Sequence, residues 1–157
     1  MIANICIEDV LLDSAKEVFE TMVFMDIEKA QEQELAIAGS ALLSSLTFDG
    51  KLKGCIGICC SELCAADIAS NMLGVSPEDG LTSDQVHDAF GEMMNMIMGK
   101  VELRLQEHYG LLQASIPCVT TGMELKNNLG NNAQRYSINL NLQDMHLLSL
   151  SLICREK

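Results

Sequence analysis

The chain has 157 residues, 48% of them hydrophobic but only 4% aromatic, which predicts one domain, residues 1–157, with an aliphatic and methionine-rich core. Lys and Arg total 10 against 22 Asp and Glu, and the net charge of -12 would repel both nucleic acid and anionic lipid headgroups. No positively charged leader or apolar run of membrane-spanning length stands in the sequence, so we expect a soluble, cytoplasmic protein with no nucleic-acid or membrane partner.

The seven cysteines are an odd number in a chain without a secretory signal, so a disulfide framework is not expected. Four of them form a cluster: Cys55, Cys59, Cys60 and Cys64. Structural zinc sites use cysteine pairs separated by a longer stretch, whereas these thiols lie in an apolar segment without a histidine. Buried thiols are therefore favoured over a zinc site, and the sequence predicts no metal ligands.

The first half of the chain combines helical and strand patterns. Apolar spacing predicts an amphipathic helix over 8–25, packed against a later, longer helix. Short runs rich in β-formers predict strands over 35–40, 41–48 and 51–60, with Asp49-Gly50 as the turn between the last two. A second helix is expected over 63–73, ended by Gly74.

The longest helical pattern covers 82–109 and begins with a capping box, Thr82 to Gln85. Its apolar residues gather on one face: Val86, Phe90, Met93, Met94, Ile97, Met98, Val101 and Leu105. Polar and small residues form a line on the opposite face: Glu92, Asn95, Gly99, Glu102 and Gln106. Gly99 costs roughly 1 kcal/mol relative to Ala in a helix interior, which suggests a close approach to the backbone there. Helix geometry alone favours the simpler interpretation of this line as a solvated face.

Strands are expected after this helix over 111–116, 118–121, 135–142 and 146–154, with a tight turn at 143–144. Helix followed by strands, read twice, predicts an α/β fold of the α+β type. In this fold two long helices pack on a largely antiparallel sheet.

Local sequence around the solvent-facing line resembles a known signature. Glu92-Met93-Met94-Asn95, followed by Gly99, is similar to the E-x-x-N signature of the CheC/CheX family of chemotaxis phosphatases. The segment 117–126 resembles the P-x-V-x-x-G-x-x-L-K stretch of CheX proteins, so the motifs cover about residues 82–126. The first helix has Glu17 and Glu20 but no asparagine three residues after either, and a single signature is closer to CheX than to CheC. Met93 and Met94 depart from relatives that often carry a small residue before the asparagine.

This resemblance implies pseudo-duplicated halves, a homodimer and a phosphatase that hydrolyses the aspartyl phosphate of a CheY-like response regulator receiver domain. By the same resemblance, Asn95 positions the attacking water, Glu92 contacts the receiver's lysine, and Gly99 and Glu102 contact the partner. The receiver supplies Mg2+, and the chain needs no cofactor of its own. The alternative is a non-catalytic docking module for a receiver or a flagellar switch protein, which the intact Glu92 and Asn95 pair disfavours. A metal or ligand sensor built on the cysteine cluster is the least favoured hypothesis.

Overall fold

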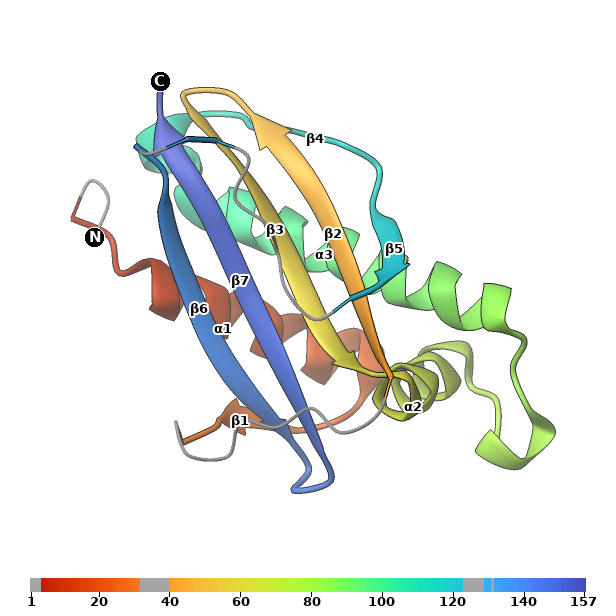
Figure 1. Ribbon diagram of the computed structural model, residues 1–157. Coiled ribbons are helices and arrows are strands. Elements are labelled where there is room, and N and C mark those ends of the chain that lie inside the picture. Colours follow the sequence, from red (N-terminus) through yellow and green to blue (C-terminus); the bar gives the residue numbers. More distant parts are fainter. Residues whose placement is uncertain (1–3, 32–39, 123–128, 131) are drawn as a thin grey trace.

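The computed structural model describes residues 4–31, 40–122, 129–130 and 132–157, and Figure 1 shows helices lying across one face of an antiparallel sheet. In chain order the elements are α1 (Ile7–Val18), a π-helical turn η1 (Phe19–Val23), β1 (Ile27–Lys29), β2 (Ala41–Asp49), β3 (Leu52–Ser61), α2 (Glu62–Leu73), a 3-10 turn η2 (Pro77–Asp79), α3 (Ser83–Tyr109), β4 (Gln113–Ala114), β5 (Cys118–Thr121), β6 (Gln134–Leu142) and β7 (His146–Glu156).

The sheet is symmetric in its strand order. Its strands follow the order β1-β6-β7-β3-β2-β4, and β5 also pairs with β2. All of these pairs are antiparallel, and β3 and β7 meet at the centre, where Ile56 pairs with Leu152. β1 of the first half pairs with β6 of the second, and β4 and β5 of the second half pair with β2 of the first. The predicted antiparallel sheet and duplicated plan are therefore confirmed, with the edge strands exchanged between halves.

The core lies between α3, α1 and the sheet. All eight residues of the predicted apolar face of α3 are at most 9% exposed: Val86, Phe90, Met93, Met94, Ile97, Met98, Val101 and Leu105. Burying a side chain of this kind stabilises a fold by about 1.5–3 kcal/mol. This face fixes the rotation of α3 about its axis, and so determines which residues face outward.

Both ends of α3 form as the sequence predicts. The Thr82 hydroxyl accepts a hydrogen bond from the Gln85 N–H at 3.1 Å, and the Gln85 side chain accepts one from the Thr82 N–H at 2.9 Å. Gly110 ends the helix with φ of 67°, and its N–H donates to the Gln106 carbonyl. Although α3 has 27 residues, no helix in the described ranges is both long and apolar enough to cross a bilayer.

The first helix is shorter than predicted. The α-helix ends at Val18, continues as η1, and stops at Phe24, whose left-handed φ of 61° reverses the chain direction. The Phe24 N–H donates to the Phe19 carbonyl at 2.7 Å, which completes the wider π-turn. The helical stretch therefore ends two residues before the predicted end at residue 25, and only its first 12 residues are α-helical. The chain then enters β1, which is too short for the strand pattern to reveal.

Most other predicted elements are confirmed to within two residues: 41–48, 51–60, 63–73, 118–121, 135–142 and 146–154. The predicted strand over 111–116 is wrong except at β4, because the Leu112 N–H donates to the Glu102 side chain and the Thr47 N–H donates to the Ser115 hydroxyl. Residues 35–39 of the predicted strand 35–40, and Leu125 and Lys126 of the second motif, lie outside the described residues.

Candidate functional site

Glu92 and Asn95 lie together on the outer surface of α3. Both side chains are exposed, and residues three apart on a helix are neighbours on its surface. The residues between them, Met93 and Met94, are both 0% exposed and hold this turn against the core. The pair therefore stands on a backbone that packing fixes, with a carboxylate and an amide available to a partner.

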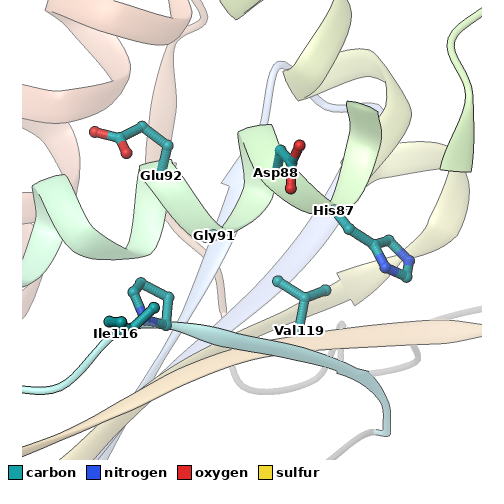
Figure 2. A pocket seen from close by; sticks show the side chains of 7 residues that line it. His87, Asp88, Gly91, Glu92, Ile116 and Val119 are labelled. Carbon is teal, nitrogen blue, oxygen red and sulfur yellow. The ribbon is translucent and has the colours of Figure 1, made fainter. Parts of the chain in front are cut away.

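A hollow of about 450 Å³ opens beside Glu92, between α3 and the segment that leads into β5. Figure 2 shows Gly91 on the side of α3 that faces Ile116 and Val119, while the Glu92 carboxylate is directed away from them. The hollow is lined by His87, Asp88, Gly91, Glu92, Ile116, Pro117 and Val119. The candidate site thus has acidic groups on the helix and an apolar wall from the following segment.

Gly91 allows β5 to lie close to α3, a role that the sequence pattern does not reveal. A Cβ atom at Gly91 would lie 3.6 Å from Val119 Cγ2 and 3.7 Å from Pro117 Cβ. These are ordinary contact distances, so alanine would fit, whereas a longer side chain would push the segment away. The apolar wall formed by Pro117 and Val119 lies close to α3 because Gly91 has no side chain.

Gly99, one turn beyond Asn95, is open. A Cβ atom built there would meet no atom of the described residues within 4 Å, apart from the backbone of its own helix. Packing inside the described part of the chain therefore does not explain the glycine. The expected close approach at Gly99 can come only from outside that part, and its role in partner contact stays a prediction.

Glu102 has an internal partner. Its Oε1 accepts a hydrogen bond from the Leu112 N–H at 3.3 Å, and the side chain is only partly exposed. This bond ties the segment after α3 back onto the helix, a structural role that the position of Glu102 on the outward line did not reveal. Its contact with a partner protein stays a prediction.

The cations on this part of α3 are paired with α1. Glu17 lies 3.5 Å from Lys100 Nζ and 3.1 Å from Arg104 Nη1. The hydrogen bond from Arg104, more than the nearby charges, lowers the pKa of the Glu17 carboxyl from its ordinary value. Glu17 therefore joins the two helices as an ionised side chain, whereas Glu92 is exposed and has no ion-pair partner among the described residues.

The cysteine cluster is mostly buried. All seven cysteines are free thiols, and Cys59, Cys60 and Cys64 are buried. Hydrogen bonding with Cys64, together with burial, raises the pKa of the Cys60 thiol well above its usual range. Within the described residues no three His, Cys, Asp or Glu side chains are placed to hold a metal ion. The sensor hypothesis therefore finds no ligand set in that part of the chain.

The histidines lie apart from one another. His146 Nε2 is 2.6 Å from Asp67 Oδ2, a pairing between residues 79 positions apart that sequence spacing could not indicate. His87 lines the hollow beside Glu92, and His108 is exposed in the last turn of α3.

The protein has helices that cross one face of a sheet whose edge strands are exchanged between the halves, and a Glu-x-x-Asn pair faces outward from its long helix. Together these features define a CheC/CheX-type protein. The family model described as chemotaxis phosphatase CheX matches residues 42–141. The chain belongs to this family, and the resemblance seen in its sequence is confirmed.

Solved structures share the fold. CheX from Vibrio vulnificus is 22% identical with a TM-score of 0.75, over 95% of this chain and 99% of that one. CheX from Borrelia burgdorferi, solved as a complex with CheY, BeF3 and Mg2+, is 19% identical with a TM-score of 0.72, over 98% and 100%. FliY from Thermotoga maritima is 19% identical with a TM-score of 0.64, over 94% and 86%. No curated protein is significantly similar to the chain in sequence.

Proposed function

We propose that this chain is a phosphatase that accelerates hydrolysis of the aspartyl phosphate on a CheY-like receiver domain. The observation that carries the proposal is the intact pair of Glu92 and Asn95 in a chain of the CheX family. Both side chains are exposed on α3, whose opposite face is buried in the core. A face that served only as a solvated surface would not need an amide and a carboxylate one helical turn apart.

Asn95 acts by positioning water. A side-chain amide both donates and accepts hydrogen bonds but is not a base near neutral pH, so it orients the water without taking its proton. The water oxygen forms a bond to phosphorus while the bond from phosphorus to the aspartate oxygen breaks, and the water proton leaves with phosphate or solvent. In-line geometry and charge stabilisation are the main requirements of phosphoryl transfer, so a well-placed amide is sufficient.

Glu92 orients the two proteins by pairing with a lysine in the receiver's active site. Charge-assisted hydrogen bonds between ammonium and carboxylate are stronger than neutral ones and fix direction. Mg2+ is bound by the receiver and neutralises charge on the transferring group. The complex of the Borrelia burgdorferi relative with CheY, BeF3 and Mg2+ supports a CheY-like partner that holds the metal. All seven cysteines are free, which is typical of a reducing compartment, so we place the reaction in the cytoplasm.

The second candidate is a docking module without catalysis. The fold alone does not distinguish it from a phosphatase, because FliY, a protein with a different name, shares the fold. The two candidates share a binding face and differ in whether Asn95 is needed for turnover.

The deciding experiment measures phosphate release from a phosphorylated receiver with Mg2+, using Asn95→Ala, Glu92→Ala and, as matched control, the exposed Gln106→Ala on the same helix face. We expect Asn95→Ala to lower the maximal rate by about 100-fold or more, the scale of losing one group that stabilises the reacting atoms, with binding retained. Glu92→Ala should raise KM and lower the rate together. Each variant should stay within about 0.5 kcal/mol of wild-type stability. A wild-type rate for Asn95→Ala would leave the docking module as the function.

A further inference from the structure

Ile116 is the most exposed large apolar side chain in the described residues, with 89% of its surface accessible. It does not contribute to the hydrophobic core, and it lines the same hollow as Glu92 and Gly91. Single exposed apolar residues are common on protein surfaces, so exposure alone means little. Its position beside the candidate site and the rigidity of its backbone distinguish it.

Both neighbours of Ile116 are fixed. The Ser115 N–H donates to the Thr47 carbonyl at 2.8 Å, and the Ser115 hydroxyl accepts from the Thr47 N–H at 2.9 Å. On the other side, Pro117 has a restricted φ and packs near the helix at Gly91. Isoleucine is itself stiff at χ1 because it is β-branched. The chain therefore holds the exposed Ile116 side chain in one conformation, so a partner that contacts it would lose little conformational entropy in ordering it.

Charge indicates what can cover this side chain. Asp88 and Glu92 share the hollow with Ile116, so an anionic lipid surface or a phosphate backbone would be repelled there. A protein whose lysine pairs with Glu92 would lie at the edge of the hollow, because Glu92 is one of its lining residues although its carboxylate is directed away from Ile116. An apolar patch beside that lysine would meet Ile116.

We propose that Ile116 is an apolar anchor that packs against the receiver next to its active-site lysine and determines which receivers are bound. This inference rests on the proposed function, and it adds a specificity-determining contact outside the Glu92 and Asn95 pair. Apolar residues that enter a partner in a preorganised conformation carry much of the binding free energy of an interface. Asn95 then positions the water, Glu92 orients the receiver, and Ile116 adds binding affinity.

The test compares Ile116→Asp, Ile116→Val and the matched control Leu63→Asp, which alters a 76% exposed residue on α2. KM and kcat are measured with a phosphorylated receiver, and Kd with the same receiver loaded with beryllofluoride and Mg2+. We expect Ile116→Asp to raise both KM and Kd by about 10-fold or more, with kcat at saturation nearly unchanged. Ile116→Val should stay within about fourfold of wild type, as one methylene is worth about 0.8 kcal/mol. Leu63→Asp should match wild type.

An unchanged KM and Kd for Ile116→Asp, with an active wild type, would overturn the anchor and leave the phosphatase proposal intact. Wild-type binding without acceleration would overturn the phosphatase, and the Kd values would still decide the role of Ile116. An equal loss of affinity in Leu63→Asp would also refute the anchor, because the effect would then be one of added charge. A wild type that binds no receiver would end both proposals.

Discussion

Replacing Gly99 by alanine should stabilise the isolated protein. A new Cβ would meet nothing within 4 Å in the described part of the chain, and Gly99 lies in the interior of the 27-residue helix α3. Alanine is favoured over glycine in such positions by about 0.8–1 kcal/mol, so the free energy of unfolding should rise by about 1 kcal/mol. With an unfolding entropy of about 2.1 cal/mol/K per residue, Tm should increase by about 3 °C.

The same change should weaken the interaction with the receiver if Gly99 is kept small for a partner. Thermal and urea melts of wild type, Gly99→Ala and Gly99→Leu measure stability, and phosphate release against receiver concentration gives KM for each. We expect both variants to melt at or above the wild-type temperature, with KM raised severalfold by alanine and docking lost with leucine. A lower Tm for Gly99→Ala would show that the position is not open. An unchanged KM for Gly99→Leu would refute a partner contact at this turn.

We propose a homodimer from the family resemblance alone, because the β-runs around Cys55 and His146 form β3 and β7 at the centre of the sheet and leave no edge to pair. Light scattering at tens of micromolar should give twice the monomer mass, and a monomer mass would disprove the dimer. Thiol reagents at neutral pH should label the exposed Cys6 and Cys118 first and Cys60 only on unfolding, because Cys60 is buried and the pKa of its thiol is raised. Fast labelling of Cys60 in the folded protein would contradict its burial. Tyr109→Phe removes the hydrogen bond that the Tyr109 hydroxyl donates to Glu156 at 2.7 Å, and should lower the free energy of unfolding by about 1 kcal/mol. Urea titration measures this change, and an unchanged midpoint would mean that water replaces the hydrogen bond without loss of stability.

Periodic patterns carried most of the fold prediction. Long elements such as α3, β3 and β7 have enough residues for the apolar repeat to show both their type and their buried face. β1 has three residues and forms because β6 offers it a partner, which is information from a distant part of the chain. The π-turn at Phe19–Val23 keeps the apolar spacing of a helix nearly unchanged, so the pattern could not show where the α-helix stops.

Side-chain partners far apart in sequence explain what was missed at the site. Periodicity correctly placed Glu102 on the outward side of α3, but its bond to Leu112 depends on where the next segment returns. The helical pattern includes Gly91 but does not show its role, because that role depends on Pro117 and Val119, which lie against it in the fold. The motif identified Glu92 and Asn95, while the wall beside them required the fold.

The two halves of the chain share a plan, yet only one presents the signature to solvent. α1 has Glu17 and Glu20 but no asparagine at the required spacing, and Glu17 is held by Lys100 and Arg104 of α3. An ionised Glu17 in that ion pair fastens α1 to the helix that carries the candidate site, and it cannot at the same time pair with a receiver's lysine. In this chain the first half therefore supports the candidate site on α3 instead of forming a second one, and we expect one receiver to bind per chain.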